Sequence, residues 1–150
     1  MTNSIETRIE AVIINKEGNL LLLEHEKNGK RYWVLPGGHL QPLEKLDKCI
    51  LRELKEELSI EKAIVKDLCF VDEYINKSKK RHIIKIGFIC EISESQAEKI
   101  KIPENESVIK NFDFLSSTKI LLSMEKFFPS KSFLIQLIKN IHKENGRNYG

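Results

Sequence analysis

The chain contains 150 residues, 25 of them basic and 22 acidic, which gives a formal net charge of +3 at pH 7. Its length matches one ordinary domain that buries a core without disulfides. The near balance of charge does not favour a dedicated nucleic-acid-binding protein. The three cysteines are widely spaced in apolar runs, which indicates buried thiols in a reducing compartment. The N-terminal residues lack a signal-peptide pattern and no apolar run reaches membrane-spanning length, so we expect a soluble, cytoplasmic protein.

The N-terminal part of the chain predicts a β-hairpin. An apolar strand starts near Arg8, a turn falls at residues 16–19, and a return strand runs through Leu23. A short extended segment follows at residues 32–36. The apolar spacing then changes to three and four residues, which predicts a helix with an apolar stripe of Leu43, Leu46, Ile50, Leu54 and Leu58.

Two further strands, residues 63–75 and 82–92, are predicted on either side of a basic turn, and another strand at 108–115. The turn, residues 76–82, contains three lysines and an arginine but no aromatic residue. One interpretation is a solvated hairpin tip that discourages edge-to-edge pairing of strands. The other is an arm that attracts phosphates.

The C-terminal third predicts two helices. Residues 117–128 form the first, with Ser116 or Ser117 as its N-cap, and the second opens with Pro129, where a missing N–H is tolerated. The order of elements, without a repeat or linker, predicts a single α+β domain over residues 1–150 in which helices cover a central sheet.

Three carboxylates share one flank of the predicted helix at residues 43–58. Glu53 and Glu57 are one turn apart and Glu56 lies beside them, so their oxygens can converge on one point. A solvated face is one explanation. A hard divalent cation is the other, because Mg²⁺ takes oxygen ligands from a few carboxylates and completes its shell with water and phosphates.

The segment from Gly38 to Ile60 resembles the Nudix box, G-x5-E-x7-R-E-U-x-E-E-x-G-U, where U is apolar. Every specified position matches except Ser59, which replaces a glycine just past the helix. A pattern of this length is far more specific than a lone glycine-rich loop. The resemblance implies the Nudix-type α/β/α sandwich with a mixed central sheet.

The resemblance also implies a metal site and a reaction. Glu53, Glu56, Glu57 and the carbonyl of Gly37 match metal ligands, with Mg²⁺ expected and Mn²⁺ as a substitute. Arg52 matches an arginine that orients a neighbouring glutamate. Glu44 matches the first glutamate of the box, and its helical bearing favours a supporting role. The implied reaction is hydrolysis of a phosphoanhydride by a metal-activated water.

A carboxylate must accept the proton of that water. Glu53 or Glu57 is a candidate within the box, and Glu106 is a candidate from a later loop, either as the base or as an outside ligand. His39 is a candidate contact for phosphate or base, and Tyr74 for stacking on a base, although a loop histidine is usually just exposed and strand aromatics are more often core residues.

The substrate expected from the family is a nucleoside triphosphate or a nucleotide sugar. Two alternatives stay open: an enzyme acting on the 5′-triphosphate end of RNA with the basic turn as an arm, and a Nudix-like module that binds a nucleotide without turnover. The number of metal ions, the identity of the base, and the choice between monomer and homodimer are not decided by the sequence.

Overall fold

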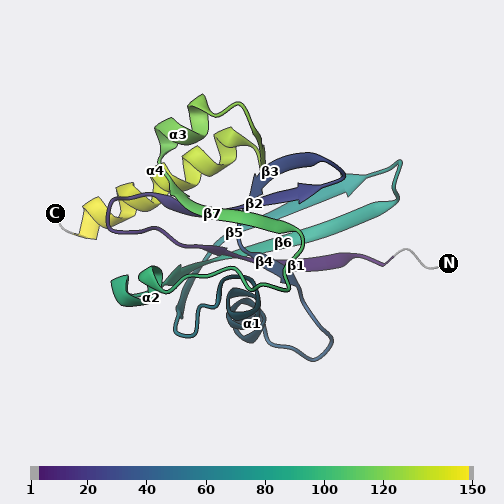
Figure 1. Cartoon of the computed structure of the whole chain (residues 1–150), viewed down its shortest axis with the longest axis horizontal. Coiled ribbons are helices and arrows are strands. Elements are labelled where there is room, and N and C mark those ends of the chain that lie inside the picture. The colour runs from purple at the N-terminus through teal and green to yellow at the C-terminus, as the bar shows by residue number, and fades with distance from the viewer. Residues whose placement is uncertain (1–3, 149–150) are drawn as a thin grey trace. The chain divides into compact units, whose positions relative to one another are not determined.

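The computed structural model describes residues 4–148 (Figure 1). Its strands form two four-stranded sheets, in the orders β4-β1-β6-β5 and β7-β2-β3-β8, and each sheet contains parallel and antiparallel pairs. The α+β class with mixed sheets is therefore confirmed. The contacts divide the chain into two compact units, the first made of residues up to 13 and 36–103, the second of residues 14–35 and 104 onward.

The first unit contains one sheet and two helices. Strand β1 pairs antiparallel with β4 and parallel with β6, and β5 pairs antiparallel with β6. Helix α1 packs against β1 and β4. The elements of this unit are β1 (Glu6–Val12), β4 (Gly37–His39), α1 (Leu46–Leu58), β5 (Ile64–Asn76), β6 (Arg81–Glu91) and α2 (Glu94–Glu98).

The predicted helix begins later than its apolar spacing suggested. A turn at residues 41–44 precedes it, in which Glu44 N–H donates to the carbonyl of Gln41 at 3.1 Å and Gln41 N–H donates to Glu44 Oε1 at 3.1 Å. Leu43 has a positive φ of 65° and is fully exposed. The expectation that Leu43 and Leu46 belong to the buried stripe is therefore wrong, and the buried residues of α1 are Cys49, Ile50, Leu54 and Leu58.

The predicted N-terminal hairpin is wrong in its pairing, although the chain does turn at residues 16–18. Strands β1 and β2 (Leu20–Lys27) belong to different sheets, and the link between them is one antiparallel bridge, Ile14 to Leu20. The two runs, 9–13 and 20–23, are buried at every residue rather than at alternate ones. Such runs are typical of central strands covered on both faces, and each strand here has two neighbours of its own.

The second unit contains the other sheet and two helices. Strand β2 lies between β3 and β7 as antiparallel neighbours, and β8 pairs parallel with β3. Helix α4 buries a stripe spaced by three and four residues, made of Leu134, Leu137, Ile138 and Ile141. The remaining elements are β3 (Lys30–Val34), β7 (Ile109–Leu115), α3 (Ser117–Leu122), β8 (Lys126–Phe128) and α4 (Lys131–Asn148).

The first predicted C-terminal helix is shorter than expected. Ser116, one of the two candidate caps, does cap α3: its Oγ accepts from Lys119 N–H at 3.1 Å. The helix ends at Leu122, and residues 126–128 form β8 instead of a helical turn. Helix α4 starts at Lys131 rather than at Pro129, because Ser130 Oγ accepts from Phe133 N–H at 3.2 Å and so marks the helix start.

Strands β5 and β6 form the long antiparallel ribbon that the sequence predicted, closed by a turn at residues 77–80 (Figure 1). Register shifts near Leu68 divide the ribbon into two parts. Within residues 4–148, no helix is long and apolar enough to cross a membrane.

Candidate active site

The glycine pair of strand β4 lies against the charged flank of α1. Gly37 N–H donates to Glu57 Oε1 at 2.9 Å. A Cβ added to Gly38 would lie 2.2 Å from Glu53 Cδ, so the carboxyl group of Glu53 occupies the space that any other side chain would fill. The group that approaches Gly38 is thus a carboxylate of the same unit.

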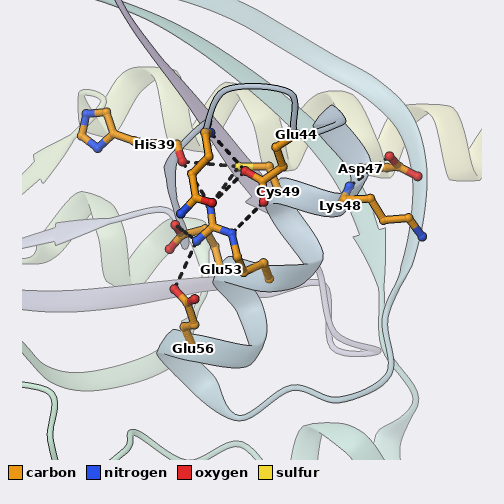
Figure 2. Close-up of polar contacts among 9 residues, drawn as sticks. His39, Glu44, Asp47, Lys48, Cys49, Glu53 and Glu56 are labelled. Atoms are coloured by element: carbon orange, nitrogen blue, oxygen red, sulfur yellow. Dashed lines mark hydrogen bonds and ion pairs between the residues drawn. The ribbon is translucent and has the colours of Figure 1, made fainter.

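Arg52 is the centre of the polar network at this flank, to which Glu44, Glu53 and Glu56, labelled in Figure 2, belong. Its Nη1 donates to Glu53 Oε1 at 2.9 Å and to Glu56 Oε2 at 3.2 Å, and its Nη2 donates to the carbonyl of His39 at 3.2 Å. Hydrogen bonds to carboxylates, those of Glu44 first, raise the pKa of Arg52, so the guanidinium is always charged. Arg52 thus ties the helix to the end of β4.

Glu44 is the strongest partner of Arg52. Its two oxygens accept from Arg52 Nε at 2.7 Å and Nη2 at 3.0 Å, a bidentate pair. The pKa of Glu44 falls to about 2, chiefly because of these bonds. The predicted helix included Glu44, whose direction on it favoured a supporting role. This premise is wrong, because Glu44 precedes α1. Its contacts are with Arg52 and with the turn at Gln41.

The three glutamates of the flank do not converge on one point. Within residues 4–148, no group of three or more His, Cys, Asp or Glu side chains is placed to hold a metal ion. Arg52 lies between Glu53 and Glu56 and donates to both, and Glu57 accepts from Gly37 N–H. The guanidinium and the amide therefore hydrogen-bond to these carboxylates, but the single positive charge of Arg52 does not balance their negative charges. The assignment of these residues as metal ligands stays a prediction.

The donor set nevertheless suits a hard cation. Glu53 and Glu57 both lie against the Gly37–Gly38 backbone, and all the candidate ligand atoms are oxygens, which Mg²⁺ and Mn²⁺ prefer over nitrogen or sulfur. Cys49 is the nearest thiol: its Sγ contacts the carbonyl of His39 at 3.7 Å, and burial raises its pKa to about 12. The thiol therefore stays protonated and is not a ligand for a soft metal.

Ser59 has a structural role that the sequence did not show. It ends α1 in the left-handed region, with φ 58° and ψ 28°, the conformation for which a glycine is usual. Its Oγ donates to the carbonyl of Lys101 at 2.9 Å, and Lys101 N–H donates to the carbonyl of Leu58 at 3.0 Å. The serine thus links the end of α1 to a segment 42 residues later, a contact that glycine cannot make.

Glu10 is a buried acid beside the site that sequence reasoning missed. It pairs with Gly37 across β1 and β4, it is only 3% exposed, and its Oε1 has no hydrogen-bond partner among the described residues. Burial raises its pKa, and the nearby charges of Lys85 and Arg8 oppose that shift. The available signal was an acidic residue between Ile9 and Ala11 inside an otherwise apolar strand.

The side chains of the remaining predicted site residues have contacts outside the Arg52 network. Glu106 belongs to the second unit, where its Oε1 accepts from the N–H groups of Val108 at 2.8 Å and Ile109 at 3.3 Å, at the start of β7. His39 ends β4 and its Nε2 hydrogen-bonds to Glu6 at 2.7 Å. Tyr74 lies on β5 and is 42% exposed. Their roles in substrate binding or catalysis stay predictions.

Comparisons with known proteins identify one family along most of the chain. The family model for the NUDIX domain matches residues 6–136. The putative 8-oxo-dGTP diphosphatase YtkD of Bacillus subtilis is 33% identical over 131 residues, which cover 79% of each chain. The ADP-ribose pyrophosphatase of Methanocaldococcus jannaschii is 28% identical over 115 residues, covering 76% of this chain and 66% of the relative.

Solved structures show the same fold. The MutT protein from Methanosarcina mazei Go1 superposes with a TM-score of 0.71 at 21% identity, covering 97% of this chain and 98% of that one. The family match extends over most of the chain and includes the glycine pair, the turn at Glu44 and the charged flank of α1. The chain therefore belongs to the NUDIX family and is a pyrophosphohydrolase, a hydrolase acting on acid anhydrides.

Proposed function

We propose that residues 1–150 act as one NUDIX domain that hydrolyses a phosphoanhydride bond in a nucleoside diphosphate derivative, either a nucleoside triphosphate or a nucleotide sugar. The observation that carries the proposal is the placement of Glu53 and Glu57 against the Gly37–Gly38 backbone, with Arg52 fixing the flank. Two relatives support the substrate class. Their names give 8-oxo-dGTP and ADP-ribose as substrates, and both compounds are nucleoside diphosphate derivatives.

The proposed cofactor is Mg²⁺, with Mn²⁺ as a substitute. Glu53, Glu56, Glu57 and the carbonyl of Gly37 would hold it, after the bonds from Arg52 to the glutamates rearrange. When bound, such an ion neutralises charge on the diphosphate and acidifies an attacking water. Arg52 would remain anchored by its bidentate pair with Glu44, which does not depend on Glu53 or Glu56. Arg52 is thus a positioning residue in this proposal.

Glu57 is the proposed general base, with Glu53 and Glu106 as the other candidates. Glu57 is half-buried, and the bond from Gly37 N–H to its Oε1 holds the carboxylate against the glycine pair. The bond thus fixes the position of the carboxylate, and a general base must lie within hydrogen-bond reach of the proton that it accepts.

The test is a panel of nucleoside triphosphates, 8-oxo-dGTP, ADP-ribose and a nucleotide sugar, assayed with Mg²⁺ and with Mn²⁺ for released phosphate or pyrophosphate. Glu57→Gln keeps an oxygen for the Gly37 N–H and removes the base, so we expect kcat to fall by about 10²–10⁴-fold with an unchanged circular dichroism spectrum. Glu61→Gln is the matched control, because the exposed side chain of Glu61 pairs, among the side chains that the structure describes, with Lys55 alone, at 3.6 Å.

Wild-type protein that binds the metal ion but turns over no substrate would refute the enzymatic proposal. Glu57→Gln activity within threefold of wild type would refute the assignment of the base alone, and the same substitution at Glu53 and Glu106 would then identify it.

A further inference from the structure

Strand β5 is an edge strand of the first unit (Figure 1). It ends the order β4-β1-β6-β5, and among the strands that the structure describes it pairs with β6 alone. Register shifts interrupt the first half of that pairing, whereas residues 70–76 pair with β6 without interruption. A regular edge offers its backbone donors and acceptors to another strand. We call residues 70–76 the edge run.

Three residues of the edge run direct their backbone hydrogen-bonding groups outward. On β1, Thr7 and Ala11 bond to β4, so the residues that alternate with them bond to β6. Parallel pairing joins those residues to the even-numbered residues of β6, so the odd-numbered residues of β6 bond to the even-numbered residues of the edge run. The N–H and C=O groups of Val71, Glu73 and Ile75 therefore face the free edge.

The side chains of the same three residues lie on the face of the sheet that carries α1. Val71 belongs to the row of cross-strand partners that ends at Gly38, and Gly38 faces Glu53 on α1. Side chains two residues apart on a strand share a face. Val71 is 64% exposed and Ile75 is 54% exposed, with the exposed Glu73 between them. Two large apolar side chains thus border an unpaired edge.

The opposite face of the edge run carries a hydrogen-bond donor and an acceptor. Tyr74 is 42% exposed, and its hydroxyl accepts from Asn76 Nδ2 at 3.1 Å. The hydroxyl hydrogen is therefore directed to another acceptor. Asp72 lies on the same face as Tyr74, and its carboxylate is an acceptor of the required kind.

An antiparallel copy of the edge run complements it when the two Glu73 residues lie opposite each other. Val71 then lies opposite Ile75 of the second copy, and Asp72 lies opposite Tyr74 of the second copy, so an apolar pair and a hydrogen-bonding pair each form twice. The outward backbone groups of the two copies also lie opposite one another. Sliding one copy by two residues in either direction places Val71 or Ile75 opposite Glu73 instead.

The charges along β5 favour the same antiparallel arrangement. The turn after the edge run contains three exposed lysines, and among the described side chains none of them lies within ion-pair distance of a carboxylate: Lys77, Lys79 and Lys80. In the register centred on Glu73, Lys79 lies beside the exposed Asp67 of the second copy. The like charges at the centre are moderated by His82, whose Nε2 lies 2.7 Å from Glu73 Oε2 in each copy.

We propose that two copies of the chain associate through antiparallel pairing of their edge runs, across a two-fold axis at Glu73. The commonest symmetry of soluble oligomers is such an axis, and it requires a self-complementary surface. The edge run is shorter than one side of a standard interface, which has about 20–30 residues, so we expect a dissociation constant in the micromolar range. The opposing explanation, that Glu73 and the turn lysines keep the edge unpaired, leaves Val71 and Ile75 in water.

The first test measures association by sedimentation equilibrium of the full-length chain at about 1–200 µM. Val71→Lys should weaken association at least about tenfold, because it places an ammonium group opposite Ile75 of the second copy. The matched control is Leu122→Lys, the same type of change at an apolar residue of α3 that is 72% exposed. Glu73→Gln should strengthen association about threefold, because it removes like charges that lie directly opposite each other. Circular dichroism checks that each variant keeps its fold.

The second test measures the register by disulfide formation in a Cys69→Ser background. Glu73→Cys should form a covalent dimer without reductant, because Cα atoms of a hydrogen-bonded antiparallel pair lie about 5.5 Å apart, a separation that suits a disulfide. Ile75→Cys is the matched control on the same face. In this register the two copies of residue 75 are offset by four residues, or about 14 Å along the strands, and do not bridge.

A wild-type chain that stays monomeric throughout this concentration range overturns the proposal. A dimer whose association Val71→Lys leaves within twofold of the Leu122→Lys control overturns it as well, because the copies then meet through another surface. Cross-linking of Ile75→Cys as fast as that of Glu73→Cys contradicts the register on which the proposal is built. Loss of association in Val71→Lys alone, with a covalent dimer of Glu73→Cys alone, supports it.

Discussion

The buried carboxyl group of Glu24, which contacts the half-buried Glu125, should make the stability of the second unit depend on pH. Glu24, on β2, is 6% exposed and shares a hydrogen bond with Glu125, which together with burial raises its pKa from 4.5 to about 6. Arg31 Nη1, 3.6 Å from Glu24 Oε1, opposes the rise without cancelling it. A pKa moved this far makes ionisation of Glu24 cost about 2 kcal/mol more in the folded protein than in the unfolded chain.

The direction follows from the raised pKa. The stabilising contribution of protonated Glu24 is complete below pH 4.5 and is lost as the pH rises through 6. Glu24→Gln stays neutral at every pH and still hydrogen-bonds to Glu125. We therefore expect Glu24→Gln to gain stability relative to wild type as the pH rises. The difference between the two free energies of unfolding, variant minus wild type, should be about 2 kcal/mol larger at pH 7.5 than at pH 4.5.

Urea unfolding followed by the fluorescence of Trp33, the only tryptophan, measures this difference across the pH range. Glu26→Gln is the matched control, since Glu26 lies on the same strand and its ion pair with Arg31, at 3.3 Å, is more exposed. A Glu24→Gln difference that does not change with pH, or one that Glu26→Gln reproduces, would refute the reasoning.

Substitutions at two further positions test the site geometry. Gly38→Ala should lower kcat about 100-fold while the fold is kept, because the added Cβ lies 2.2 Å from Glu53 Cδ and must displace that carboxylate. The control Gly29→Ala adds a Cβ that meets no atom within 4 Å; its φ of 73° makes the alanine strained, so stability should fall while kcat is unchanged, and equal activity of both variants would contradict the assignment. Ser59→Ala should lower the free energy of unfolding by about 1 kcal/mol through loss of the bond to Lys101. Ser59→Gly should lose less, because relief of the left-handed backbone offsets that bond; urea denaturation that ranks the two variants in the opposite order would show that the hydroxyl does not stabilise the helix end.

Most elements were predictable because their signals are local. The period of Ile50, Leu54 and Leu58 predicted α1, and the turn residues between two apolar runs predicted the β5–β6 ribbon. Pairing was not predictable where a strand is buried on both faces: the run at 20–23 contains no alternation that would identify its neighbours, which are β3 and β7.

Short elements were missed because tertiary contacts hold them. Strand β8 has three residues and pairs with β3, and β4 has two glycines and pairs with β1. Helix α2 has five residues, but Ser93 followed three positions later by Gln96 was a usable capping signal, and Ser93 Oγ does accept from Gln96 N–H at 3.1 Å.

The sequence predicted a set of candidate site residues, whose roles stay predictions, but not the contacts among them. The pattern from Gly38 to Ile60 identified the family, yet spacing along a helix does not show that Arg52 reaches back to Glu44 across a turn, or that Ser59 Oγ reaches Lys101. Both contacts join residues whose separation depends on how the loops fold, and this information is not contained in helical periodicity.

The division of the chain into two discontinuous units has a consequence for synthesis. The chain passes from one unit to the other after residues 13, 35 and 103. Strand β1 therefore cannot pair with β6, nor β2 with β7, until a much later part of the chain has been synthesised; in the second pair, Leu20 lies opposite Leu115. The leucines at 20–23 therefore emerge from the ribosome long before the strand that covers one edge of β2, and closing such long loops slows folding. A fragment of residues 36–103 would carry the whole Nudix box but lack β1, an inner strand of its sheet, so the box cannot be transferred to another protein as one contiguous piece.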